Sequence, residues 1–430
     1  MSSAPPSEGN HRGQSLVAEP HGYLPLEYLR RRFTRVTSSV AYIPQLDGLR
    51  ALALFMVLGH HIFALYVQAT HRLGAQKLPD DWGLIFYRSP LVGWALNLAF
   101  GVSIFFAISG FVVSLPFVRA MQEGTRLPST GLYLWRRLLR LEPPYFIHMI
   151  LMFLWLVIWP TRPWFFSIAM VKVFGPHLLA TLAYMHAQIF QGPSWINGIA
   201  WTLEIEIQFY LLMPLLAFLL RIPPLHLRRA MLAGSIAATA LLGQYVLPGL
   251  HNPRLQYSIL GHSEFFLAGI LLADLYVAPP AWLWLKPRKA DVCAFISGAL
   301  VIYILHWREP LAWIQPFLLI VLYFSIFRGK WAGWFFQLPW LTIPGTMCYT
   351  VYLYHPFVLE RMLPVTTRVF APKHSLAFDL CIQSLVLVPV ILAVSAVLYL
   401  VTERPFVLLS HRATRRWNAA RTERMGGKPA

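Results

Sequence analysis

The stretch from residue 46 to residue 61 reads LDGLRALALFMVLGHH: an apolar run that begins with two charged residues and ends with two histidines. The run continues to about residue 68, which is long enough to cross the ~30 Å hydrocarbon core of a bilayer as a helix. Apolar stretches of similar length recur as far as the region of Val401. The pattern predicts an all-α fold, a polytopic membrane helix bundle.

Composition supports this class of protein. Hydrophobic residues make up 57% of the 430 residues and charged residues only 13%. In a soluble protein roughly a quarter of all residues are charged. The first forty residues lack the order of a signal peptide. We therefore expect one membrane domain, residues 44–406, between a polar and amphipathic cytoplasmic tail, residues 1–43, and a basic cytoplasmic tail, residues 407–430.

The net charge of +18 does not indicate nucleic-acid binding, because the basic residues stand in short runs between apolar segments. This is the pattern of cytoplasmic loops under the positive-inside rule. It indicates the lipid bilayer as the partner, no nucleic acid, and cytoplasmic placement of both termini. The runs are Arg30 to Arg32, Arg136-Arg137 with Arg140, Arg228-Arg229, Lys286 to Lys289, Arg328 with Lys330, and Arg415-Arg416.

About ten transmembrane helices satisfy that rule. This number requires the segment 164–190, which Gly175-Pro176 and two histidines interrupt, to be re-entrant or interfacial, since irregular backbone at membrane depth must be buried in protein or line a cavity. An eleventh crossing there would invert the orientation of everything after it. The ten predicted spans are 48–68, 91–115, 143–160, 199–220, 230–249, 255–278, 290–306, 310–327, 340–362 and 377–401.

The first span carries ionisable residues on one stripe. Eleven residues separate Arg50 from His61, which returns to nearly the same helix face about three turns and ~16 Å further along. Asp47 lies one turn before Arg50, on the same side. The plainer interpretation is a boundary ion pair and a buried histidine. Ionisable groups inside membrane helices are costly, however, and usually face a functional cavity, which favours a functional stripe.

A second cluster is WRRLLRLEPPY, residues 135–145. Pro143 predicts the start of a helix. A positive-inside flank would explain any two of the three arginines. Arg137 and Arg140 are three residues apart, so on a helix they would present two guanidinium groups side by side, an arrangement suited to phosphate or pyrophosphate.

A third cluster is WTLEIEIQFY, residues 201–210. Glu204 and Glu206 fall on nearly opposite helix faces, so they do not form an obvious acid/base pair. Smaller signals are Ser109, Tyr352 and His355, for which helix packing is the plainer interpretation. The three cysteines have no metal-type spacing, and we expect no metal site.

These motifs, in this order, resemble the bacterial membrane-bound acyltransferase family 3, which transfers acyl groups to glycans and other hydroxyl-bearing acceptors. The resemblance covers about 44–406 and rests on six ordered blocks. The blocks are Leu46 to Ala51 with His61, Phe105-Phe106 with Ser109 to Phe111, Arg137 to Arg140 with Pro143 to Tyr145, Trp201 to Tyr210, Phe265 to Gly269, and Tyr349 to His355.

The resemblance implies an inner-membrane (cytoplasmic-membrane) enzyme that uses cytoplasmic acyl-CoA as co-substrate, with acetyl-CoA the first expectation and no bound cofactor. Arg50, Arg137 and Arg140 match residues thought to hold the coenzyme phosphates, and His61 matches the proposed catalytic histidine. Three positions depart from the family pattern: Ser103, Glu204 and Ile207. These departures bear on acceptor specificity more than on the reaction.

The resulting hypothesis is an O-acyltransferase in which His61 is the general base on an acceptor hydroxyl and Glu206 orients the acceptor or an imidazolium. The acceptor would be a glycan, a lipid-linked sugar or a small molecule. Asp47, Trp201, Ser109, Tyr352 and His355 would support the site. Direct transfer and a route through an acyl-histidine both fit the residues. The main alternative is a multi-pass transporter or flippase of a glycan or small molecule, which predicts inverted repeats; none is visible in the sequence.

Overall fold

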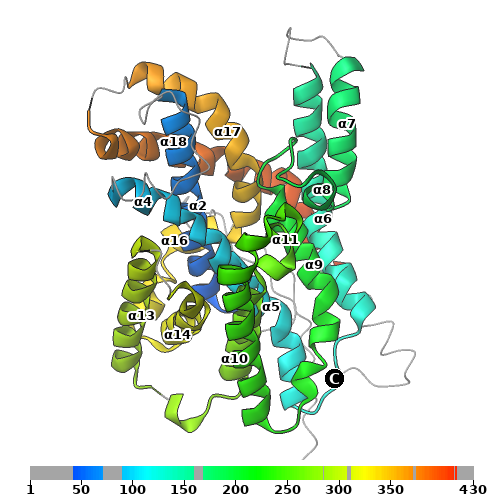
Figure 1. Ribbon diagram of the computed structural model, residues 1–430, viewed down its shortest axis with the longest axis vertical. Coiled ribbons are helices and arrows are strands. Elements are labelled where there is room, and N and C mark those ends of the chain that lie inside the picture. Colours follow the sequence, from blue (N-terminus) through cyan, green and yellow to red (C-terminus); the bar gives the residue numbers. More distant parts are fainter. Residues whose placement is uncertain are drawn as a thin grey trace, which may run out of the picture. The chain divides into compact units, whose positions relative to one another are not determined.

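The computed structural model describes residues 42–70, 90–158, 168–283, 285–307, 311–370, 374–410 and 412–413, all of which belong to one compact unit (Figure 1). Every regular element in these ranges is helical, which confirms the predicted all-α membrane helix bundle. Almost all of the predicted amino-terminal tail, 1–43, and most of the predicted carboxyl-terminal tail, 407–430, lie outside the described residues.

The α-helices of the described residues follow in this order along the chain. They are α2 (Pro44–Thr70), α4 (Pro90–Asn97), α5 (Gly101–Gln122), α6 (Thr130–Ile158), α7 (Ile168–Leu182), α8 (His186–Phe190), α9 (Ala200–Leu216), α10 (Leu225–Leu241), α11 (Pro253–Gln256), α12 (Ser263–Val277), α13 (Pro287–Trp307), α14 (Gln315–Arg328), α15 (Trp331–Phe335), α16 (Pro339–Thr346), α17 (Cys348–Val369) and α18 (Leu376–Leu398).

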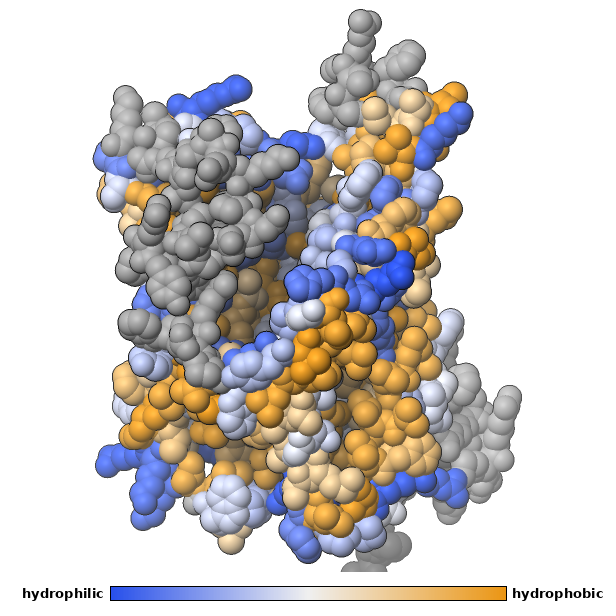
Figure 2. Space-filling view, in the orientation of Figure 1, coloured by the Kyte–Doolittle hydropathy of each residue, from blue (hydrophilic) through white to orange (hydrophobic). Residues whose placement is uncertain are grey.

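Six helical segments among the described residues are long and apolar enough to cross a membrane, so the chain is a multi-pass membrane protein. Figure 2 shows hydrophobic residues over much of the viewed surface, with hydrophilic residues along its lower edge. The predicted spans 230–249, 255–278, 310–327 and 340–362 fall on α10, α12, α14 and α16–α17, which are not among these six segments. The six segments are Pro44–Thr70, Leu91–Gln122, Thr130–Ile158, Ala200–Arg221, Pro287–His306 and Leu376–Ser410.

The predicted helix start at Pro143 is wrong. Helix α6 begins at Thr130 and runs through both Pro143 and Pro144 to Ile158. A proline inside a helix removes the N–H that would bond the carbonyl four residues earlier. Helix α6 nevertheless continues through both prolines, and it packs against α7, α9 and α17. Arg137 and Arg140 therefore stand within a helix rather than in the loop before one.

The segment predicted to be irregular, 164–190, is described from residue 168. Helix α7 passes through Pro176 and ends at Leu182, and the chain then turns at Tyr184, whose φ is +56°, before the short helix α8. Helix α7 packs beside the upper part of α6 (Figure 1). The helix therefore ends about two turns after Gly175-Pro176. The hydroxyl of Tyr184, at the turn, donates to Glu142 of α6 at 3.0 Å.

Close helix packing in the core depends on glycine. Helices α5 and α12 make the most extensive contact of the described elements. A Cβ on Gly110 of α5 would lie 2.3 Å from the carbonyl oxygen of Phe266, and a Cβ on Gly269 of α12 would lie 2.3 Å from that of Ala107. Small residues at such crossings let membrane helices approach closely, and this contact fixes α5 beside the site described below.

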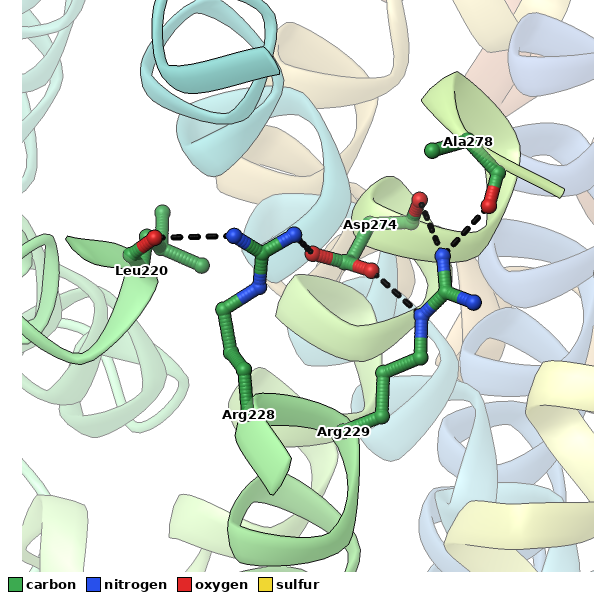
Figure 3. Close-up of polar contacts among 5 residues, drawn as sticks. All are labelled: Leu220, Arg228, Arg229, Asp274 and Ala278. Carbon is green, nitrogen blue, oxygen red and sulfur yellow. Dashed lines mark hydrogen bonds and ion pairs between the residues drawn. The ribbon is translucent and has the colours of Figure 1, made fainter. Parts of the chain in front are cut away.

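A buried ionic cluster joins α10 to α12 (Figure 3). Arg228 and Arg229 both pair with Asp274, and the Arg229 Nε–Asp274 Oδ1 distance is 2.7 Å. Arg228 also donates to the carbonyl of Leu220 at 2.9 Å, and Arg229 to that of Ala278. The sequence indicates only a basic loop here. In the structure both arginines also bind carbonyl groups at the ends of helical segments.

Candidate functional site

Helix α2 carries the predicted ionisable stripe as one unbroken helix. Arg50 donates from Nη1 to Oδ1 of Asp47 at 2.5 Å, and the Asp47 carboxylate is fully buried. The hydroxyl of Tyr42 also donates to Asp47, at 3.0 Å. The ion pair expected from the plainer interpretation is present, and it holds the Arg50 side chain in place.

A cavity of about 120 Å³ brings the three predicted phosphate-binding arginines together. Arg50 reaches it from α2, and Arg137 and Arg140 reach it from α6. Among the described residues that line it, Glu206 is the one carboxylate, so the cavity carries a net positive charge. Guanidinium groups on two helices facing one cavity suit the binding of phosphate groups.

Glu206 of α9 is held inside this cavity by hydroxyl groups. The hydroxyls of Ser109 and Tyr210 both donate to its Oε1, that of Ser109 at 2.7 Å. The guanidinium carbon of Arg137 lies 5.2 Å from the centre of the Tyr210 ring, in a cation–π arrangement. The predicted residues Ser109, Glu206 and Arg137 thus form one network through Tyr210.

Tyr352 of α17 lines the same cavity. Its hydroxyl lies 2.7 Å from the Oγ1 of Thr202 on α9, and both side chains are buried. The Tyr352 ring packs against the ring of Phe105 on α5, with centroids 5.9 Å apart. Tyr352 therefore links three helices that are distant in the sequence.

His61 is not among the described residues that line this cavity. Its ring instead packs against His355 of α17, with centroids 5.0 Å apart. Nδ1 of His355 lies 2.7 Å from the carbonyl oxygen of Tyr352. A carbonyl only accepts, so Nδ1 carries the proton and Nε2 keeps its lone pair. Nε2 is buried and has no hydrogen-bond partner among the described groups.

Two other predicted residues lie away from the cavity lining. The ring of Trp201 packs against Tyr257 and His262, with centroids 5.4 and 5.5 Å away. Glu204, which the sequence places opposite Glu206, accepts the backbone N–H of Ala187 at 3.0 Å and so ties α8 to α9. Glu204 and Glu206 do face different neighbours, as their spacing predicts.

The sequence analysis missed Thr202 and Tyr210 as members of the site. Both line the cavity, and both lie four residues from Glu206, one turn before and one turn after it. Residues four apart share a helix face. A stripe of hydroxyl, carboxylate and hydroxyl at 202, 206 and 210 is therefore a signal that the sequence does contain.

His148 of α6 is a further buried polar residue that the sequence analysis did not single out. It is fully buried, and its Nε2 lies 2.7 Å from the amide nitrogen of Asn197, which also donates to the carbonyl of Leu353 at 3.0 Å. This network ties α6 and the start of α9 to α17, next to the residues that hold His355.

The sequence is similar to those of three bacterial proteins. The chain is 24% identical over 366 residues to the peptidoglycan O-acetyltransferase OatA of Listeria monocytogenes, a match that covers 78% of this chain and 52% of the relative. It is 25% identical over 357 residues to YrhL of Bacillus subtilis, covering 75% and 50%. It is 26% identical over 310 residues to nodulation protein 10 of Rhizobium leguminosarum, covering 66% and 79%.

The chain thus spans about half the length of the first two relatives. No solved structure matches it. A family model described as an acyltransferase domain matches residues 43–400, which include α2 through α18 and every residue of the cavity. By this match over most of its length, the chain belongs to the membrane-bound acyltransferase family 3.

Proposed function

We propose that this protein is an integral-membrane O-acyltransferase that moves an acyl group, acetyl in the first instance, from acyl-CoA to a hydroxyl group of an acceptor. The observation that carries the proposal is the cavity in which Arg50, Arg137 and Arg140 meet. Acyl-CoA carries several phosphate groups, and guanidinium groups bind phosphate through paired, charge-assisted hydrogen bonds.

The donor enters from the cytoplasm in this proposal. The basic segments between predicted spans, such as Arg119 to Arg140 and Arg221 to Arg229, support a cytoplasmic position for the face that carries them. They also support an inner-membrane location with both termini cytoplasmic. The coenzyme phosphates rest against the three arginines, and the pantetheine arm extends along α2 toward His61. The ~16 Å rise from Arg50 to His61 is comparable to the length of that arm.

His61 acts as the general base. Its imidazole takes the proton of the acceptor hydroxyl while the hydroxyl oxygen bonds to the thioester carbonyl carbon, and the thiolate then leaves and is protonated. A positioned base typically contributes 10²–10⁴-fold to such a step. Glu206, held by two hydroxyl groups, orients the acceptor or balances the charge of the imidazolium.

The acceptor is a glycan, a lipid-linked sugar or a small hydroxyl-bearing molecule. The name of the Listeria relative, a peptidoglycan O-acetyltransferase, supports a glycan as the first acceptor to test. The alternative is a transporter without acyl transfer, which would not need a coenzyme to bind in the arginine cavity. A measurement of acyl-CoA binding therefore distinguishes the two functions.

The test uses the purified full chain in nanodiscs, as wild type and as His61→Ala, incubated with acetyl-CoA and a membrane-glycan extract. Free thiol release and the mass of the extracted products are followed together. We expect thiol release with an acetyl mass gain in the wild type and neither in His61→Ala. Absence of coenzyme binding to the wild type would reject the proposal and favour the transporter.

A further inference from the structure

Tyr352 occupies the boundary between the arginine cavity and the histidine pair. Its side chain lines the cavity that holds Arg50, Arg137 and Arg140. The same ring lies 5.8 Å from the ring of His355, which in turn packs against His61. Tyr352 is therefore in contact with both halves of the proposed reaction path.

Apolar side chains pack around the Tyr352 ring. It belongs to a small apolar cluster with Val57 of α2 and Ile199, and Val102 and Phe105 of α5 pack against that cluster. Val57 is one turn before His61 on α2, so this cluster lies directly below the histidine on the same helix. Val102, Phe105 and Tyr352 also line the cavity, so the apolar cluster extends from the cavity wall to the helical turn before His61.

Among the described residues, the Tyr352 hydroxyl makes one hydrogen bond, and it is a neutral one. It joins the Tyr352 hydroxyl to Oγ1 of Thr202, 150 residues away on α9. A neutral hydrogen bond between hydroxyl groups has a modest net strength. Binding of the donor can therefore break this bond and move the Tyr352 side chain. His61 itself is partly exposed, which leaves it open to an acceptor from outside the cavity.

We propose that Tyr352, held by Thr202, is the residue that selects the acceptor hydroxyl against water, by separating the donor cavity from His61 until both substrates are bound. The inference rests on the proposed acyl transfer. The competing reaction is hydrolysis, in which a water oxygen bonds to the thioester carbonyl carbon and the thiolate leaves, giving a free carboxylic acid and the coenzyme thiol. Closing the path before the acceptor arrives suppresses this loss, as lids do in other enzymes.

The experiment measures thiol release from acetyl-CoA by the full chain in nanodiscs, with and without an acceptor extract that the wild type acetylates. The quantity of interest is the ratio of acceptor-independent hydrolysis to transfer. Thr202→Val and Tyr352→Phe remove the hydrogen bond but keep the side-chain volume, and we expect each to raise the ratio about fivefold. Tyr352→Ala removes the ring as well, and the ratio should rise about tenfold or more.

Tyr323→Phe is the matched control. Tyr323 is a buried tyrosine whose hydroxyl donates to a backbone carbonyl, that of Ile104 on α5, at 3.2 Å, and it is not among the described residues that line the cavity. Its ratio should equal that of the wild type. Acetyl-CoA binding is measured for every variant, so loss of the folded site is separated from loss of the barrier.

An unchanged ratio in both Thr202→Val and Tyr352→Phe, with donor binding and transfer intact, would overturn the inference while leaving the acyltransferase proposal standing. Loss of both hydrolysis and transfer in Tyr352→Ala, with donor binding intact, would overturn it too, because Tyr352 would then take part in the chemistry. Failure of the wild type to bind acetyl-CoA is a different outcome, since it rejects the proposed function itself.

Discussion

The imidazole ring of His61 on α2 lies against that of His355 on α17, with ring centroids 5.0 Å apart. These residues are 294 positions apart in the sequence. The carbonyl of Tyr352 fixes the proton of His355 on Nδ1, so the buried His355 has an unprotonated Nε2. The His355 ring packs against the proposed base, so it limits the orientations that the His61 ring can adopt.

Replacing His355 should therefore slow transfer without removing donor binding. We expect His355→Leu to lower kcat about 100-fold and His355→Gln, which keeps an acceptor atom near the position of Nε2, to lower it about tenfold. The measurement is thiol release with acceptor, together with acetyl-CoA affinity and the pH profile of kcat. Equal losses in the two variants would contradict a role for the polar side chain of His355 in positioning His61.

Replacing Arg137 or Arg140 in the cavity should weaken donor binding, whereas replacing the neighbouring Arg136 should not. A hydrogen bond to a charged group contributes about 1.5–3 kcal/mol, so Arg137→Ala and Arg140→Ala should each weaken acetyl-CoA binding at least about tenfold. Arg136→Ala is the matched control, because Arg136 adjoins Arg137 on α6 but is not among the described residues that line the cavity. Titration calorimetry in nanodiscs measures the three affinities, and a loss of the same size in Arg136→Ala would count against the phosphate site.

Glu206 permits a test of charge apart from hydrogen bonding. Both hydroxyl donors bond to the same oxygen, Oε1, so Glu206→Gln can keep both bonds while it removes the negative charge. We expect Glu206→Gln to stay folded and to lose transfer, whereas Glu206→Ala should also lose about 1–3 kcal/mol of stability because two buried hydroxyls lose their acceptor. Thermal unfolding and transfer rates distinguish the variants. Full activity of Glu206→Gln would assign Glu206 a packing role only.

Gly269 should be intolerant of alanine. Its Cβ would lie 2.3 Å from the carbonyl oxygen of Ala107 and 2.5 Å from the backbone nitrogen of Phe111, so α12 must move away from α5. We expect Gly269→Ala to destabilise the protein by about 1–3 kcal/mol. Gly234→Ala on α10 is the control, since no atom lies within 4 Å of the added Cβ, and its effect should stay within about 1 kcal/mol. Thermal unfolding in detergent compares the two.

The sequence by itself determined the features that depend on neighbours along the chain. Hydrophobic length alone predicts the membrane helices, and the helical repeat places Arg50 and His61 on one stripe of α2 and sends Glu204 and Glu206 to different neighbours. The same repeat contains the Thr202–Glu206–Tyr210 stripe, although Thr202 and Tyr210 were not identified from it. The helix start at Pro143 was predicted wrongly, because proline's local preference does not account for the packing that carries α6 through it.

Only the tertiary structure decided which of these stripes meet. Arg50 shares a cavity with Arg137 and Arg140, and Tyr352 bonds Thr202. His61 packs against His355, whose ring also contacts that of Tyr352. Each of these relationships joins helices that are distant in the chain. Their meeting depends on how closely helices can approach at glycine contacts such as Gly110 with Phe266, and no local pattern in one sequence encodes that approach.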